Sequence, residues 1–295
     1  MTTSSLRLGL VGSGIARSMA PAFHIRAGQL SGIDITYELL EHDAGEVDQI
    51  PALIEHYRSQ GFDGLNVTFS FKERVAAITR VDDPSVRVIG AVNTVLLGGD
   101  QPQPVAHNTD FSGFQRRWHH RWPYRSPGVV ALVGTGGVGR ALAFALGELG
   151  AIELRLFDLD SDKSRLLAAA LESRFDHLTV VMASTAEAAA DGADGVVNGT
   201  PIGMYFAPGA PVDLDVIGSQ AWLFDAVYSP IGTPLLVRAR ERGVDVLSGF
   251  ELFLGQGLDA YAHFTGGELD PSIATQLEAE LWQAVDTAPG TKPQR

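Results

Sequence analysis

The feature that most constrains the fold is a buried strand that runs directly into three spaced glycines and then into a helix. Residues 129–133 read Val-Val-Ala-Leu-Val, and residues 137–149 have the composition of a helix. Gly134, Gly136 and Gly139 have the spacing Gly-x-Gly-x-x-Gly. The first glycine permits a tight turn, the second lets the backbone approach a ligand, and the third lets helix and strand pack closely. Such a unit is typical of a parallel sheet with helices on both faces.

The same turn predicts a binding site for a dinucleotide. Exposed N–H groups and the positive end of a helix attract an anion such as a pyrophosphate. A glycine pattern alone is weakly specific, but here a strand precedes it, a helix follows it and Asp158 ends the next strand. The alternative is a glycine-rich turn without a ligand. The candidate cofactor contacts in this turn are Gly134, Gly136, Gly137, Val138 and Gly139.

Asp158 bears on which dinucleotide is bound, because it lies about 20 residues beyond the last glycine of the turn. A carboxylate there accepts hydrogen bonds from both ribose hydroxyls and repels a 2′-phosphate, so we expect NAD rather than NADP. NADP stays open, because Lys163 and Arg165 lie close enough in the sequence to offset a phosphate. The alternative role of Asp158 is to cap the next helix, which Asp160 or Ser161 could do instead.

Apolar runs alternate with helical stripes along the rest of the chain. The predicted strands are 6–11, 33–40, 64–69, 129–133, 153–157, 179–182, 195–198 and 222–226. The predicted helices are 20–28, 47–59, one that begins near Lys72, 137–149, 163–175 and a helical stretch from 250 to about 285. Residues 91–97 and 105–107 flank Gly98-Gly99-Asp100 and suggest a hairpin or meander. This alternation predicts an α/β fold, and the proline-rich residues 122–128 mark a junction between its two halves.

Composition excludes several classes of partner and site. The formal net charge of −13 repels phosphate backbones and anionic lipids, so we expect neither nucleic acid nor membrane as a partner. The absence of Cys excludes disulfides and thiolates, and the eight His show no paired ligand spacing, so no metal site is predicted. No apolar run reaches the ~20 residues of a membrane span, and residues 1–5 do not begin a signal sequence, so we expect a cytoplasmic protein.

Four polar clusters follow predicted strands in the first half, where open α/β sheets bind ligands. They are Ser18 and residues 66–72, 91–94 and 107–110. Their Asn, Thr, Lys and Asp side chains suit a small polyhydroxylated ligand. Lys72 beside Asp110 could pass a proton to or from a carbinol oxygen while hydride moves to a nicotinamide. The alternative is a solvated lysine at the start of a helix and an Asn-Thr-Asp turn.

Ordered motifs along most of the chain resemble the shikimate/quinate dehydrogenase family. In the first half they are Gly12 through Pro21 to His24, Asn66-Val67-Thr68 with Phe71-Lys72, Gly90-Ala91-Val92-Asn93-Thr94, and Asn108-Thr109-Asp110 with Gly113. In the second half they are the glycine turn, Asn198-x-Thr200-Pro201-x-Gly203-Met204, Asp225-x-Val227-Tyr228-x-Pro230 with Thr233-Pro234-Leu235-Leu236, and Gln256 before Phe264-Thr265-Gly266. So many ordered blocks are highly specific for the family and much less specific for its members.

The resemblance implies a two-domain enzyme with its active site in the cleft between the domains. The N-terminal α/β substrate-binding catalytic domain would span 1–112 and 250–286, the Rossmann-like doubly wound dinucleotide-binding domain 113–249, and a disordered tail 287–295. Lys72 and Asp110 match the family's catalytic pair. The matches to its substrate contacts are Ser18, Thr68, Asn93, Tyr228 and Gln256, and those to the loop near the nicotinamide are Asn198, Thr200 and Met204. For that loop, a tight turn set by proline and glycine is an equally compatible alternative.

Three residues depart from the family's pattern. Ala20 stands where a second hydroxyl usually holds the substrate carboxylate, Ser70 replaces a proline two residues before Lys72, and Phe111 follows Asp110 where many members have glycine. Because the motifs of both halves occur together, the leading hypothesis is an NAD-preferring dehydrogenase that interconverts shikimate and 3-dehydroshikimate. The alternatives are quinate or an amino analogue as substrate, or a non-catalytic sensor of a dinucleotide or metabolite. We also consider a homodimer as the oligomeric state.

Overall fold

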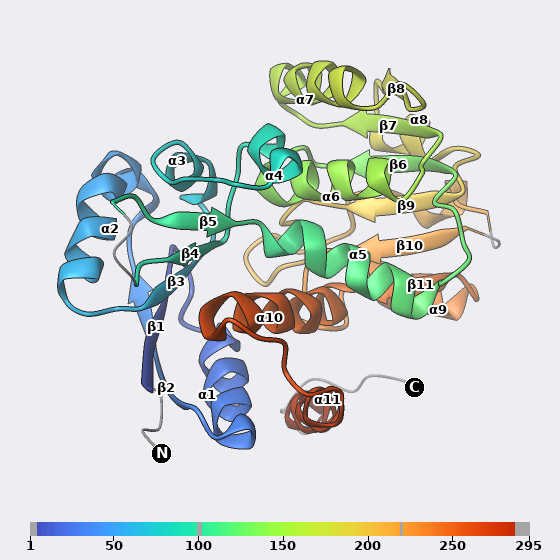
Figure 1. Cartoon of the computed structure of the whole chain (residues 1–295). Helices are drawn as coiled ribbons and strands as arrows, with labels where there is room; N and C mark the ends of the chain where they lie inside the picture. The colour runs from blue at the N-terminus through green and yellow to red at the C-terminus, as the bar shows by residue number, and fades with distance from the viewer. Residues whose placement is uncertain (1–4, 99–101, 219–220, 287–295) are drawn as a thin grey trace. The chain divides into compact units, whose positions relative to one another are not determined.

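The computed structural model describes residues 5–98, 102–218 and 221–286, which form two compact units (Figure 1). Unit 1 takes in the described residues up to Thr109 together with Gln256–Val285, and unit 2 takes in Asp110–Gly255. The boundaries fall within two helices, α5 (Thr109–Arg121) and α10 (Gly249–Thr265). Three predicted features lie outside the described residues, namely the tail 287–295, the start of the N-terminal segment (1–4) and the turn at Gly99-Asp100.

Unit 1 contains a five-stranded mixed sheet. Its strands are β1 (Ser5–Gly12), β2 (Asp34–Glu41), β3 (Gly64–Val67), β4 (Thr94–Leu96) and β5 (Val105–His107), in the order β2-β1-β3-β4-β5. The first three are parallel, and β4 runs antiparallel to both β3 and β5, which confirms the predicted meander. β3 ends two residues before its predicted end, because Phe71 N–H donates to Thr68 O (3.0 Å) and Ser13 N–H donates to Phe69 O (2.8 Å), which turns the chain out of the sheet.

The described part of unit 1 also contains helices. They are α1 (Ala20–Ser31), the 3₁₀ helix η1 (Ala44–Gln49), α2 (Ile50–Ser59), α3 (Lys72–Ala76), α4 (Pro84–Ile89) and α11 (Pro271–Asp286), with the later part of α10. The predicted helix 47–59 is α-helical only from Ile50, where Pro51 suits a first turn. The predicted helical stretch from 250 breaks at Gly266, whose φ is +75°. At Gly64 an added Cβ would lie 2.4 Å from the Phe264 ring, so the absent side chain lets α10 pack against the sheet.

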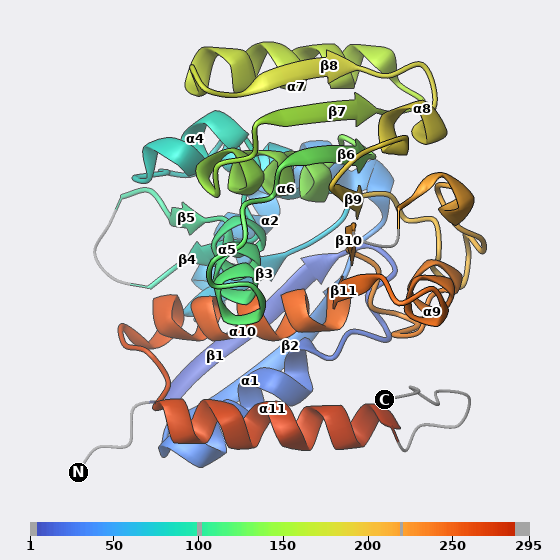
Figure 2. The same cartoon turned by 90° about the vertical axis from the view of Figure 1, so that its right-hand side faces the viewer.

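Unit 2 contains a six-stranded parallel sheet, whose strands lie side by side in Figure 2. They are β6 (Val129–Val133), β7 (Glu153–Phe157), β8 (Thr179–Met182), β9 (Gly195–Asn198), β10 (Trp222–Asp225) and β11 (Asp245–Ser248), in the order β11-β10-β9-β6-β7-β8. Its helices besides α5 and the start of α10 are α6 (Gly137–Glu148), α7 (Ser161–Arg174), α8 (Ala186–Ala190), the 3₁₀ helix η2 (Leu214–Val216) and α9 (Pro234–Glu241). The strand order reverses between β6 and β9, as in doubly wound dinucleotide-binding folds, and confirms the predicted fold class.

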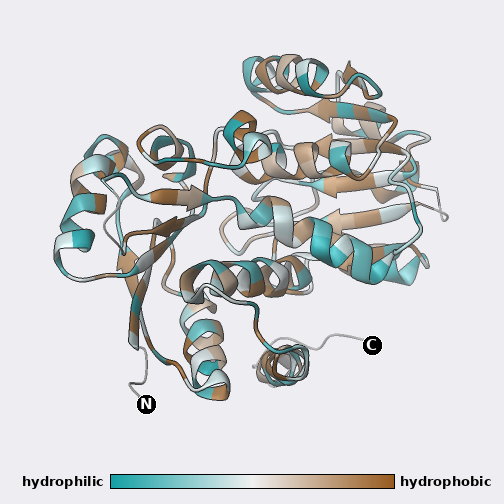
Figure 3. Cartoon of the chain, viewed as in Figure 1, coloured by the Kyte–Doolittle hydropathy of each residue, from teal (hydrophilic) through white to brown (hydrophobic). Residues whose placement is uncertain are grey.

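The cores of both units follow from buried apolar strands, which are mostly brown in Figure 3. In unit 2 three indole rings also pack together beside the start of β10. Trp118 lies 4.7 Å from Trp122 and 4.8 Å from Trp222 between ring centroids. Trp122 donates its indole N–H to Asp245 Oδ2 (2.6 Å), and Trp222 donates its indole N–H to Pro127 O (3.1 Å). The predicted junction 122–128 is thus fixed to β10 and β11.

No helix in the described part of the chain is long and apolar enough to span a membrane.

Candidate active site

In unit 1 the structure brings together Asn93 and Gln256, two of the predicted substrate-binding residues. The Asn93 Nδ2 donates to Gln256 Oε1 at 3.3 Å. The Asn93 Oδ1 accepts hydrogen bonds from Thr109 N–H (2.7 Å) and Thr109 Oγ1 (3.1 Å). Because Thr109 opens α5, Asn93 fixes the start of the helix whose next residue is Asp110. Asp110 itself is 3 % exposed.

A second layer of hydrogen bonds centres on Asn66 and holds Asn93 in place. Tyr37 Oη donates to Asn66 Oδ1 at 2.8 Å. The Asn66 Nδ2 donates to Asn93 O (3.2 Å) and Thr94 Oγ1 (3.1 Å). Asn66 lies in a predicted polar run and in a family motif, but the sequence alone indicates no role for it. Its role follows from the β3–β4 register, which sets Asn66 opposite Thr94 and is a feature of the tertiary structure.

The main chain at Lys72 is tied to the same region. Val92 N–H donates to Lys72 O at 3.1 Å, so the first residue of α3 lies beside the residue that precedes Asn93. Thr68 N–H donates to Val11 O at 2.9 Å, which anchors the start of the loop to β1. Ser70 has a buried Oγ with no hydrogen-bond partner among the residues that the structure describes. The proline that the family has at this position would place no hydroxyl there.

Ser18 lies two residues before the start of α1. Its Oγ accepts a hydrogen bond from Ala20 N–H at 3.2 Å, and its own hydroxyl proton can still be donated to a ligand. The carboxylate of Glu41 holds the preceding loop, because it accepts hydrogen bonds from Gly14 N–H and from Ile15 N–H. The loop that carries Ser18 is therefore fixed at the carboxyl ends of β1 and β2.

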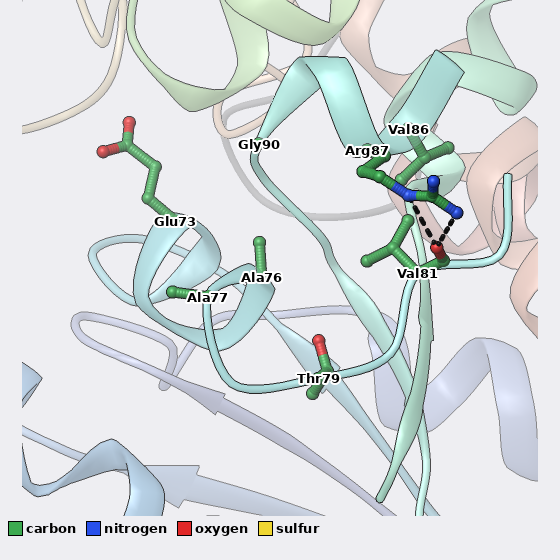
Figure 4. A pocket seen from close by; sticks show the side chains of 8 residues that line it. All are labelled: Glu73, Ala76, Ala77, Thr79, Val81, Val86, Arg87 and Gly90. Carbon is green, nitrogen blue, oxygen red and sulfur yellow. Dashed lines mark hydrogen bonds between the residues drawn. The ribbon is translucent and has the colours of Figure 1, made fainter. Parts of the chain in front are cut away.

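A surface cavity of about 370 Å³ lies beside α3 (Figure 4). Glu73 and Arg87 lie on opposite sides of it, and Arg87 Nε and Nη2 donate to Val81 O at 3.2 and 3.0 Å. The residues that line it include none of the predicted site residues. The predicted substrate contacts therefore do not line this cavity.

In unit 2 the glycine turn fits a dinucleotide. Gly134 has a φ of +91°, and an added Cβ at Gly139 would lie 1.9 Å from Gly134 O. At Gly136 an added Cβ would meet nothing within 4 Å, so this side of the turn is open to a ligand. Gly136 also supplies no side-chain cap, which leaves the N–H groups at the head of α6 available to a pyrophosphate. The predicted contacts Gly137 and Val138 lie in the first turn of the same helix.

The carboxylate of Asp158 lies at the end of β7, beside this turn. Its Oδ2 accepts hydrogen bonds from Thr135 N–H (2.7 Å) and Thr135 Oγ1 (3.0 Å), and its Oδ1 accepts one from Asp160 N–H (2.9 Å). Partial burial raises the pKa of Asp158, but these hydrogen bonds and Lys163 outweigh it and hold the pKa below its ordinary value. The N-cap of α7 is Asp160, so Asp158 does not cap that helix.

The loop after β9 carries Asn198, Thr200 and Met204. The Asn198 Oδ1 accepts hydrogen bonds from Thr200 N–H (2.9 Å) and Thr200 Oγ1 (2.7 Å). Met204 N–H donates to Pro201 O at 3.0 Å, and Gly203 has a φ of +113°, so the segment forms a tight turn. These contacts fit the turn interpretation, and a role near a nicotinamide stays a prediction.

Asp225 is a buried acid that sequence reasoning quoted in a motif but gave no role. It is 0 % exposed and accepts hydrogen bonds from Asn198 Nδ2 (2.8 Å), Val227 N–H (3.0 Å) and Thr233 Oγ1 (2.5 Å). Burial raises its pKa to about 6 against the effect of these donors. Asp225 thereby joins β9, β10 and the start of α9. Nearby, the ring of Tyr228 stacks on Phe253 with centroids 5.3 Å apart.

His24 is a buried titratable group in unit 1 and gives a pH-dependent prediction. Its ring stacks on Tyr37 with centroids 5.0 Å apart and is 2 % exposed. Burial lowers its pKa from 6.5 to about 3, and a hydrogen bond with Asn66 opposes this only in part. The folded state therefore binds fewer protons than the unfolded state below pH 6.5, so stability falls as the pH falls from 6.5 towards 3.

We expect a His24→Gln variant to lose this part of the pH dependence. Between pH 7.5 and 5.0 the free energy of unfolding of the wild type should fall by about 2 kcal/mol more than that of the variant. Urea unfolding followed by circular dichroism at both pH values measures the difference. His107 and His263 also have lowered pKa values through burial and act in the same direction, so the variant keeps some dependence. Equal slopes for the two proteins would contradict the prediction.

Comparison with known proteins shows which class this fold and site define. The family model described as the shikimate dehydrogenase substrate binding domain matches residues 10–95. A shikimate dehydrogenase (NADP(+)) of Pseudarthrobacter chlorophenolicus is 37% identical over 97% of this chain and 98% of its own length. A quinate/shikimate dehydrogenase (NAD(+)) of Corynebacterium efficiens is 36% identical over 92% and 96% respectively. The solved structure of quinate dehydrogenase from Corynebacterium glutamicum in complex with NAD superposes with a TM-score of 0.84, at 33% identity over 95% of this chain and 99% of the other.

Proteins of this class combine a substrate-binding domain with a dinucleotide-binding domain. The chain belongs to the shikimate/quinate dehydrogenase family, which confirms the resemblance predicted from its motifs. Its relatives include both NAD and NADP enzymes, so family membership alone does not choose between the two cofactors.

Proposed function

We propose that this protein catalyses the reversible oxidation of shikimate to 3-dehydroshikimate, with NAD as the preferred hydride acceptor. Residues 1–112 and 250–286 form the substrate-binding catalytic domain, and residues 113–249 form the dinucleotide-binding domain. The observation that carries the proposal is the family match over nearly the whole chain. When bound, NAD accepts the hydride that leaves the ring carbon.

In this proposal Lys72 takes the proton of the reacting hydroxyl, and Asp110 orients both the lysine and that hydroxyl. The hydrogen-bonded frame of Asn93, Thr109 and Gln256 supports the assignment, because it fixes the residue next to Asp110. Asn93 and Gln256 also bind the ring hydroxyls. Ser18 and Thr68 extend this polar lining, and Tyr228 stays a predicted substrate contact.

The preference for NAD is supported by the surroundings of Asp158. The neighbouring Leu159 is 94 % exposed and offers no cation to a 2′-phosphate. The two cations that could offset such a phosphate already have acidic partners: Lys163 Nζ lies 3.9 Å from Asp160 Oδ2, and Arg165 pairs with Asp162. A 2′-phosphate would therefore meet the Asp158 carboxylate without a free counter-charge from these two side chains.

Initial rates with shikimate and quinate, each with NAD and with NADP, test the proposal directly. We expect the highest kcat/KM for shikimate with NAD, and at least about a tenfold preference over NADP because of the carboxylate at Asp158. Formation of NADH that depends on shikimate would rule out the non-catalytic sensor. A preference for NADP would overturn the cofactor assignment, and no turnover of either acid would overturn the reaction.

Quinate is the second candidate substrate. Ala20 removes a side-chain hydroxyl from the segment that in the family holds the substrate carboxylate, and the smaller side chain leaves room for the extra hydroxyl of quinate. An Ala20→Ser variant should therefore shift the ratio of kcat/KM towards shikimate by about tenfold, because the larger side chain takes the room that the extra hydroxyl of quinate needs. The same rate measurements decide between the two acids.

An Asn66→Ala variant should raise KM for shikimate by about tenfold while the Kd for NAD stays unchanged, because the loss leaves Tyr37 without its acceptor and releases the Asn93 main chain. Steady-state rates and calorimetric titration with NAD measure the two quantities. Tyr37→Phe is the matched control, since it removes only one of the bonds to Asn66 and should have a smaller effect. A change in KM below about twofold would show that this layer does not position Asn93.

A further inference from the structure

Thr135 occupies the variable position between the first two glycines of the turn in unit 2. Its side chain is 4 % exposed, and its Oγ1 lies 3.0 Å from Asp158 Oδ2 and 3.3 Å from Ser164 Oγ. Ser164, on α7, is 1 % exposed. When Thr135 donates its hydroxyl proton to the carboxylate, the Ser164 hydroxyl can donate to Thr135. The three side chains therefore form a short hydrogen-bonded row that ends on Asp158.

This row restricts what the carboxylate of Asp158 can still bind. A carboxylate offers about four acceptor positions, two on each oxygen. Thr135 fills both positions on Oδ2 with its N–H and its hydroxyl, and Asp160 N–H fills one on Oδ1. The open position lies on Oδ1, so one ribose hydroxyl can be accepted there rather than the two that the sequence alone suggested. Rotation of the carboxylate would break the bonds from Thr135.

We propose that Thr135, supported by Ser164, is a positioning residue that sets the orientation of the Asp158 carboxylate and thereby the preference for NAD over NADP. The inference rests on the proposed function, in which Asp158 receives the ribose of NAD. Thr135 acts only through Asp158 and supplies its hydroxyl to the carboxylate rather than to the dinucleotide. The hydroxyl matters more than the shape of the side chain, so serine can replace threonine and the isosteric valine cannot.

Calorimetric titration of Thr135→Val and Thr135→Ser with NAD and NADP, without substrate, tests this role. We expect the Kd for NAD to rise about tenfold in Thr135→Val, because a bond to a charged group is lost, and the Kd for NADP to change by less than about twofold. Thr135→Ser should bind NAD like the wild type. A merely structural role would weaken NAD and NADP equally, and that result would overturn the proposal, as would unchanged binding of NAD.

An Asp158→Asn background separates failure of the inference from failure of the proposed function. If Asp158→Asn leaves the Kd for NAD unchanged, Asp158 does not hold the ribose and the cofactor assignment fails. If it weakens NAD but Thr135→Val does not, only the role of Thr135 fails. If both substitutions raise the Kd for NAD, their effects on the binding free energy should not add in the double variant, because Thr135 acts through Asp158. Should Thr135→Val fold poorly, Ser164→Ala removes the support behind Thr135 and should give a smaller shift of the same sign.

Discussion

A Lys72→Met variant is expected to oxidise shikimate about 10²- to 10⁴-fold more slowly than the wild type while it binds NAD with unchanged Kd. Methionine keeps most of the length of the side chain but removes the amine that accepts the hydroxyl proton, so the loss falls on kcat. The main chain at position 72 is fixed by the bond from Val92 N–H and should not move. Steady-state rates give kcat, and calorimetric titration gives the Kd for NAD.

Arg74→Met is the matched control, because it removes an exposed cation from the same helix two residues further on. It should leave kcat within about twofold of the wild type, as surface substitutions usually do. Turnover of Lys72→Met at the wild-type rate would remove Lys72 from the mechanism. A variant that loses kcat and NAD binding together would instead point to a disturbed fold.

Gly139→Ala is expected to abolish measurable NAD binding and to lower Tm by several degrees. The added Cβ would lie 1.9 Å from Gly134 O, and a main-chain oxygen within a glycine turn cannot yield by rotating a side chain. The helix must therefore move away from β6, which costs stability and destroys the pyrophosphate site together. The expected loss in affinity is about 100-fold or more, equivalent to roughly 3 kcal/mol.

Gly136→Ala separates these two consequences. An added Cβ there meets no protein atom within 4 Å and the backbone φ of −69° suits alanine, so Tm should stay unchanged. The same Cβ would occupy the space that a pyrophosphate needs, so NAD binding should weaken strongly. Wild-type affinity in Gly136→Ala would show that the dinucleotide does not lie over this turn.

The strands of unit 2 could be predicted closely because their bounds are marked in the sequence. β6, β7, β8 and β9 have the predicted limits, since each is a short segment with Val or Leu at two or more positions and lies between predicted helices or turns. β11 (Asp245–Ser248) was missed, because it has four residues at a sheet edge and is defined by pairing with β10. Helices α4 and α8 were missed for a similar reason, as five or six residues are too few to show a helical stripe.

The candidate site likewise contains residues that could be predicted from local sequence and contacts that could not. Lys72 and the glycine turn could be named from local sequence because each opens a helix. The links from Asn66 to Asn93 and Thr94 depend on how β3 and β4 are paired, with Asn66 opposite Thr94. The row from Ser164 to Asp158 joins α7 to β7 through Thr135. Such contacts join residues far apart in the sequence, so they follow from tertiary structure alone.

Because most of the tryptophans lie in unit 2, tryptophan fluorescence can follow the unfolding of the two units separately. Of the four tryptophans, Trp118, Trp122 and Trp222 form the cluster of unit 2, and Trp282 lies on α11 in unit 1. Intrinsic emission therefore reports chiefly on unit 2. In a Trp282→Phe protein, emission excited at a wavelength that only tryptophan absorbs would report on unit 2 alone, and subtracting that denaturation curve from the wild-type curve would isolate the unfolding of unit 1.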